Sequence, residues 1–286
     1  MDRVEAVFVN STKDGYDIPC KIWQAKNDQP RAAAFYVHGG AFANGGCDSH
    51  PLMSRALSQT LGITIITASF RCGAVAPYRT GTTLQDLKDV TKYFKKKVQG
   101  TGLPFGVIGS SSGGYFAMEL ATQVPEFQFD FCIPICPVAH PGRRASYLKD
   151  CISGKAASNP YYGQNCHTPE KAEEMLGRQL SYWETDEAME AAGELFQSYR
   201  IANRGVPPTL LIMGAVDKNV PMHVHQLVQA WATRTIIVGG AGHEIQNEPP
   251  TGELNIKKFL WDIDEFLTIV LRKKKNDSNI EVWCWC

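Results

Sequence analysis

Residues 105–118 read FGVIGSSSGGYFAM, in which an apolar run is followed by a glycine and serine cluster and then by apolar residues at helical spacing. The run Phe105–Ile108 is typical of a buried strand. Gly109 and Gly113 each stand two residues from Ser111, which leaves room for a sharp bend from strand to helix. Such a bend lifts the Ser111 hydroxyl to the end of a sheet, beside the positive end of a helix. We therefore predict that Ser111 is a nucleophile, the alternative being a flexible linker.

A general base and an acid are needed as well, because an unassisted serine hydroxyl is a weak nucleophile at neutral pH. His243 lies in the glycine-rich loop VGGAGHE after a predicted strand, Thr235–Val238, and Asp217 follows the preceding predicted strand. Ser111, Asp217 and His243 thus occur in the order nucleophile, acid, base, each after a different strand. We predict that they form a catalytic triad. Glu244 is an alternative acid, but it adjoins His243 in the chain, so its side chain is expected to point elsewhere.

A negatively charged tetrahedral intermediate also needs hydrogen-bond donors. One predicted donor is the amide of Ser112, the residue after the nucleophile. A second group follows the predicted strand that ends near His38, where Gly39 and Gly40 have no side chain to keep their amides from a ligand. We predict an oxyanion hole formed by Gly39, Gly40 and Ser112, with His38 bracing the loop by hydrogen bonds. Taken by itself, the glycine pair is also consistent with an ordinary turn.

Short strands alternate with helical patterns along most of the chain, which predicts a mostly parallel sheet with helices on both faces. The predicted strands are 4–10, 18–24, 32–38, 63–70, 105–108, 129–138, 209–213 and 235–238, and the predicted helices are 84–98, 112–124, 224–231 and 254–270. The first two strands form an antiparallel edge. The strand rhythm stops after Val138, which predicts an inserted lid over 139–206 between core segments 1–138 and 207–272. Within this lid, residues 169–199 are predicted to form a helical stretch. A lysine run without periodicity predicts a disordered tail over 273–286.

Composition excludes several functions. The 29 basic and 29 acidic side chains cancel, so no broad basic field favours nucleic acid. No apolar stretch approaches the roughly 20 residues that span a bilayer, and the absence of a secretory signal predicts reduced cysteines and a cytoplasmic location. No nucleotide-binding motif is present, so we expect no cofactor. We expect no metal either: Cys132 and Cys136 are predicted to be small hydrophobes on one face of a strand, and His223 and His225 have no evident third ligand.

The chain resembles the α/β-hydrolase superfamily over about Ala32–Leu271, in particular the esterase and lipase group with an HGG oxyanion loop. The likeness rests on the motifs above, on ASFR at 68–71 and on LQDL at 84–87. Some features are closer to other branches. Ala41 stands where the HGGG form has a third glycine, as in kynurenine formamidase-like and feruloyl esterase-like enzymes. Ser110 and Ser112 flank the nucleophile differently from hormone-sensitive-lipase-like members, and the Asp217 turn is similar to that of prolyl-oligopeptidase-like hydrolases.

This resemblance implies a three-layer α/β-hydrolase fold. It also implies a serine hydrolase that cleaves a small-molecule carboxylic ester through an acyl-enzyme, without a cofactor or metal. Amide or formamide hydrolysis, lyase chemistry and acyl transfer by the same triad remain alternatives, because this fold hosts many reactions. A catalytically silent receptor is a further alternative. The sequence indicates no oligomeric state.

Overall fold

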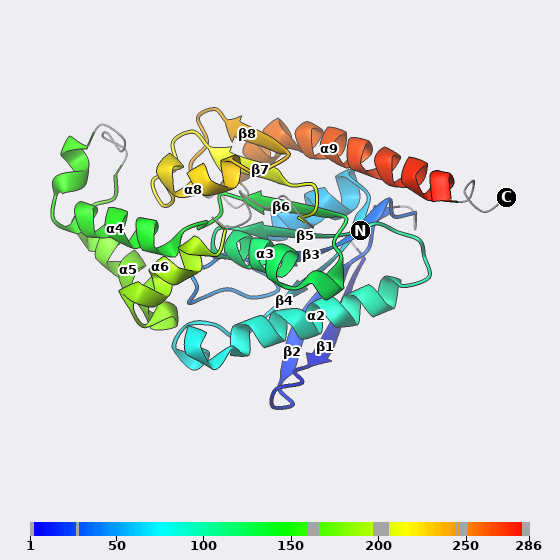
Figure 1. Ribbon diagram of the computed structural model, residues 1–286, viewed down its shortest axis with the longest axis horizontal. Helices are drawn as coiled ribbons and strands as arrows, with labels where there is room; N and C mark the ends of the chain where they lie inside the picture. Colours follow the sequence, from blue (N-terminus) through cyan, green and yellow to red (C-terminus); the bar gives the residue numbers. More distant parts are fainter. Residues whose placement is uncertain are drawn as a thin grey trace.

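A twisted sheet forms the centre of the protein in a computed structural model, which describes residues 3–26, 29–159, 166–196, 206–243, 245 and 251–281 (Figure 1). Within these residues the sheet has eight strands in the order β1-β2-β4-β3-β5-β6-β7-β8. Their bounds are β1 (Val4–Asn10), β2 (Asp17–Trp23), β3 (Ala32–Val37), β4 (Ile63–Ala68), β5 (Phe105–Ser110), β6 (Phe131–Ile135), β7 (Leu210–Gly214) and β8 (Arg234–Val238).

The edge formed by β1 and β2 is antiparallel, and β2 also runs antiparallel to β4. The remaining strand pairs, from β4 and β3 to β7 and β8, are all parallel. All eight predicted strands are present, and the predicted fold class is confirmed. Every residue of β3, β4, β5, β6 and β7 is buried, because helices cover both faces of the sheet. The continuous apolar runs in the sequence reflect this double covering.

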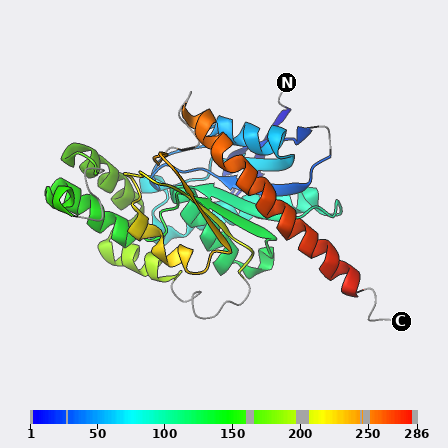
Figure 2. The same ribbon diagram turned by 90° about the horizontal axis from the view of Figure 1, so that it is seen from above.

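The helices divide into two layers and an insertion. Packed against one face are α2 (Thr82–Val98), α3 (Ser112–Gln123) and α8 (Met222–Gln229). The other face is covered by α1 (Pro51–Arg55) and α9 (Thr251–Glu281), and Figure 2 shows α9 crossing it. Within the described residues, no helix is both long and apolar enough to cross a bilayer.

The last helix differs from its prediction. It continues to Glu281, so the disordered tail expected from residue 273 is not found over 273–281. Residues 282–286 lie outside the described residues.

The insertion between β6 and β7, which we call the lid (139–206), contains α4 (Pro141–Ile152), α5 (Pro169–Trp183) and α6 (Asp186–Glu194). These three helices lie together at the left of Figure 1, far from the turn that joins β1 and β2. The predicted single helical stretch, 169–199, is two helices, because Glu184 adopts a positive φ of 67° between them. Residues 160–165 and 197–205 of the lid lie outside the described residues.

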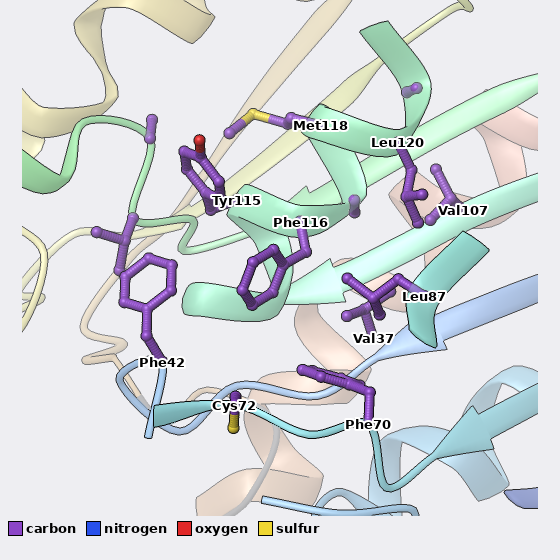
Figure 3. Close-up of a cluster of buried hydrophobic side chains, with 14 of the residues drawn as sticks. Val37, Phe42, Phe70, Cys72, Leu87, Val107, Tyr115, Phe116, Met118 and Leu120 are labelled. Carbon is purple, nitrogen blue, oxygen red and sulfur yellow. The ribbon is translucent and has the colours of Figure 1, made fainter. Parts of the chain in front are cut away.

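An aromatic cluster joins the lid to the loop after β3. Phe42 of that loop stacks on Tyr182 of α5, with ring centroids 5.6 Å apart, and meets Trp183 edge-on at 5.3 Å. Tyr115 and Phe116 of α3 also meet the Phe42 ring edge-on, with centroids 5.7 and 5.5 Å away, and Figure 3 shows these three rings next to one another. Burying rings of this size stabilises the folded state and ties the position of the lid to that of the loop.

Candidate active site

Ser111 occupies the bend between β5 and α3 that the sequence predicts. Its backbone lies at φ 55° and ψ −122°, a conformation that is strained for every residue except glycine. The neighbouring glycines make the bend possible. A Cβ added to Gly109 would lie 2.1 Å from the carbonyl oxygen of Gly113, and one added to Gly113 would lie 2.2 Å from that of Val37. Only hydrogen atoms at these two positions allow the chain to close around the serine.

The three predicted side chains meet at the carboxyl ends of their strands. The Ser111 hydroxyl donates to His243 Nε2 at 2.8 Å, and His243 Nδ1 donates to Asp217 Oδ2 at 2.8 Å. The other carboxylate oxygen, Oδ1, accepts the backbone N–H groups of Asn219 at 2.8 Å and Val220 at 2.9 Å. These contacts give the imidazole the tautomer that can accept a proton from serine. Glu244, the alternative acid, lies outside the described residues.

The environment of Asp217 keeps its carboxylate ionised although it is buried. Burial by itself raises the pKa of Asp217, but attraction to His243, the hydrogen bond from its imidazole and the Val220 amide outweigh burial and lower the pKa below its usual value. A carboxylate that stays charged can orient the imidazole and stabilise the imidazolium that forms when the serine proton is transferred.

The predicted oxyanion hole needs one correction. The N–H of Gly39 donates to Nε2 of His50 at 3.1 Å, so it is already engaged. Within the described part of the chain, the amides of Gly40 and Ser112 have no acceptor, and neither does that of Ala41. We therefore remove Gly39 from the predicted set and add Ala41 as a candidate donor. His50 follows the glycine motif by ten residues and carries no local signal, which is why sequence reasoning missed it.

The loop that carries these amides is strained and held on two sides. Ala41 and Phe42 both have positive φ, at 54° and 66°, and the stacking of Phe42 on the lid offsets this cost. On the other side, His38 Nδ1 bonds the Gly39 carbonyl oxygen at 2.7 Å, and its ring stacks on Phe70 with centroids 4.2 Å apart. Burial lowers the pKa of His38 to about 4, so it is neutral at physiological pH and braces the loop as predicted.

Side chains of the lid form hydrogen bonds to the turn that contains Asp217. The buried guanidinium of Arg144 donates to the carbonyl oxygen of Asn219 at 2.9 Å, and the Tyr147 hydroxyl donates to that of Lys218 at 2.6 Å. His167 Nε2 lies 2.6 Å from the side-chain oxygen of Asn219. The lid thereby holds the turn whose amides bind the Asp217 carboxylate. Sequence reasoning identified none of these lid residues, because their partners are more than 50 positions away.

The expectation that Cys132 and Cys136 share a face is wrong. Cys132 packs in the core beneath α2 and α3, whereas Cys136 packs on the opposite face. The reason is that β6 ends at Ile135 and Cys136 turns out of the strand with a positive φ of 42°. A two-residue alternation no longer applies once the chain has left the extended conformation.

We expect the variant Gly113→Ala to be at least about 3 kcal/mol less stable than the wild type, because its Cβ meets the backbone oxygens of Val37 and His38, which have no room to move. Gly177→Ala is the matched control. A Cβ at Gly177 in α5 meets no atom within 4 Å, so this variant should gain up to about 1 kcal/mol. Urea unfolding of both variants measures the difference, and equal midpoints would refute the packing argument.

Several known proteins resemble this chain in sequence. Residues 34–234 match the family described as alpha/beta hydrolase fold. An ethyl acetate hydrolase from Pseudomonas putida is 31% identical over 121 residues, which cover 40% of this chain and 37% of that protein. The esterase LipU of Mycobacterium tuberculosis is 28% identical over 99 residues, covering 35% and 32%. The matches therefore span about a third of the length of these curated relatives.

Solved structures share the fold over nearly the whole chain. The esterase of Pyrobaculum calidifontis is similar with a TM-score of 0.70 and 17% identity, covering 94% of this chain and 86% of that one. Brefeldin A esterase, a bacterial homologue of human hormone-sensitive lipase, is similar with a TM-score of 0.74 and 16% identity, covering 95% and 78%. Because the family match extends over more than half of the sequence and the sheet order agrees with it, the chain belongs to the α/β-hydrolase fold family.

Proposed function

We propose that the protein is a serine esterase that cleaves a small-molecule carboxylic ester through an acyl-enzyme. The observation that carries this proposal is the relay of two 2.8 Å contacts from Ser111 through His243 to Asp217, at a strained bend beside unoccupied amides. The names of the two curated relatives, an ethyl acetate hydrolase and an esterase, support an ester as the substrate class.

In the proposed reaction, Ser111 Oγ attacks the ester carbonyl carbon while His243 Nε2 takes the hydroxyl proton. The Asp217 carboxylate stabilises the imidazolium, and the amides of Gly40, Ala41 and Ser112 stabilise the negative oxygen of the tetrahedral intermediate. His243 then gives its proton to the leaving alcohol. Water, activated by the same imidazole, attacks the acyl-enzyme and releases the carboxylic acid and the serine.

A fluorophosphonate ester tests this proposal, because it reacts with an activated serine and stays attached. We expect mass spectrometry of peptides to find the adduct on Ser111, and hydrolysis of 4-nitrophenyl acetate to fall in proportion to labelling. Labelling of another residue, or full labelling with undiminished turnover, would refute the assignment. The corresponding 4-nitroanilide, assayed beside the ester, separates ester cleavage from the alternative amide cleavage.

A further inference from the structure

A third potential metal ligand lies beside the imidazole and carboxylate of the site. The Sγ atom of Cys136 and one ligand atom each from Asp217 and His243 all lie within 4.8 Å of one another. Cys136 reaches this place because it turns out of β6, and its own N–H is held by the carbonyl oxygen of Ile212 at 2.8 Å. The proposed reaction has no step for this thiol, so its position needs a separate explanation.

We propose that Cys136, Asp217 and His243 bind a thiophilic divalent cation such as Zn²⁺, and that the bound cation stops hydrolysis. Sulfur, imidazole nitrogen and carboxylate oxygen are the three donors that zinc takes from proteins. Two ligands of a tetrahedral zinc lie about 3.5 Å apart, so the separations here need to shrink by little more than about 1 Å. Water would take the fourth position, as in other zinc sites with three protein ligands.

Charge balance favours a divalent cation at this place. When Zn²⁺ binds, the thiol loses its proton to solvent, and if the metal takes Nδ1 the imidazole proton moves to Nε2, so the ring stays neutral. The thiolate and the Asp217 carboxylate then neutralise the two positive charges. The buried Arg144 guanidinium acts on Asp217 too and opposes a further cation. We therefore expect micromolar affinity, weaker than that of a structural zinc site.

Inhibition follows from which atoms the cation would use, and this step rests on the proposed function. A cation on Nδ1 replaces the hydrogen bond to Asp217, and a cation on Nε2 takes the lone pair that accepts the Ser111 proton. In either case the serine loses its general base. The site would therefore act as an off switch within the catalytic machinery, and Cys136 would be the residue that makes it possible.

The test begins with protein freed of metals by a chelator. Titration of the wild type with Co²⁺, which substitutes for zinc and is coloured, should produce a thiolate-to-cobalt charge-transfer band. Zn²⁺ should abolish 4-nitrophenyl acetate hydrolysis at micromolar concentrations, and chelator should restore it. In Cys136→Ala the band should disappear, and the zinc concentration for half inhibition should rise at least tenfold.

Cys132→Ala is the matched control, since it removes a buried thiol from β6, just before Cys136 in the chain but on the opposite face of the sheet. It should keep both the band and the sensitivity to zinc. Equal sensitivity of Cys136→Ala and the wild type, or a band that persists in Cys136→Ala, would overturn the proposal. If Cys136→Ala does not fold, Cys136→Ser gives the same comparison, because a hydroxyl cannot produce the thiolate band.

The cobalt band also separates this inference from the proposed function. Ser111→Ala retains all three ligands, so it should bind Co²⁺ with the same band although it has no nucleophile. A band in Ser111→Ala with no esterase activity in the wild type would leave the site standing and refute the function. If the wild type hydrolyses the ester but shows no cobalt band, the metal site is refuted and the proposed function stands.

Discussion

Ser111→Ala is expected to lower kcat for ester hydrolysis by about 10⁶-fold, the loss seen when a triad nucleophile is removed from a serine hydrolase. Without Oγ no acyl-enzyme forms, and only stabilisation of direct water attack by the backbone amides remains. Steady-state kinetics with 4-nitrophenyl acetate measures the loss, and the fluorophosphonate adduct should disappear with it. The fold should persist, because alanine tolerates the same backbone no worse than serine does.

The neighbouring Ser110 offers a matched control for Ser111. Its hydroxyl is buried and lies 2.7 Å from the Tyr36 hydroxyl. Ser110→Ala should lose about 1 kcal/mol of stability through this hydrogen bond and keep its kcat within a few-fold of the wild type. If both alanine variants lose activity equally, or if Ser111→Ala keeps more than a trace of it, Ser111 is not the nucleophile.

Asp217→Asn is expected to lower kcat by about 10⁴-fold, with a much smaller change in KM. The N–H groups of Asn219 and Val220 would hold the oxygen of the new amide, which turns its NH₂ group toward His243 Nδ1. Two donors then face each other, so the imidazole moves its proton to Nε2. In that tautomer Nε2 cannot accept the proton of Ser111.

Asp130→Asn makes the same chemical change at a distance from the site. The Asp130 carboxylate accepts the N–H of Phe105 at 2.8 Å at the start of β5, and its replacement should leave kcat within a few-fold of the wild type. Kinetics of the two asparagine variants on one ester compares the positions directly. A tenfold loss or less in Asp217→Asn would mean that another group orients the imidazole, and Glu244 would be the next residue to replace.

Local patterns predicted much of the fold and most of the candidate site. The strands β4 and β5 are apolar throughout because helices bury both faces of the sheet. The helices α2 and α3 have apolar residues at helical spacing because they pack on the sheet. The bend at Ser111 was predictable for a similar reason. Gly109 must lack a side chain because the backbone of Gly113, four residues away, lies against it. A requirement between residues so close in the chain is visible in the local sequence.

Features that depend on partners far along the chain were not predictable in this way. The hydrogen bond from the Gly39 N–H to His50 forms only when the start of α1 packs against the loop after β3. The hydrogen bond from Arg144 to the Asn219 carbonyl oxygen joins residues 75 positions apart. Neither leaves a periodic signal, because one hydrogen bond constrains only two residues. The side of the sheet on which Cys136 lies was mispredicted because a single dihedral angle, at the end of β6, decides it.

The order of Ser111, Asp217 and His243 along the chain, each after its own strand, determined which side chains the protein has available for catalysis, since parallel strands deliver their carboxyl ends to one edge. Tertiary structure alone decided which amides remain unoccupied, how the lid holds the acid turn, and that a thiol lies next to the imidazole. These features depend on how closely segments distant in the chain approach one another when they pack, and such distances have no counterpart in the linear pattern of residues.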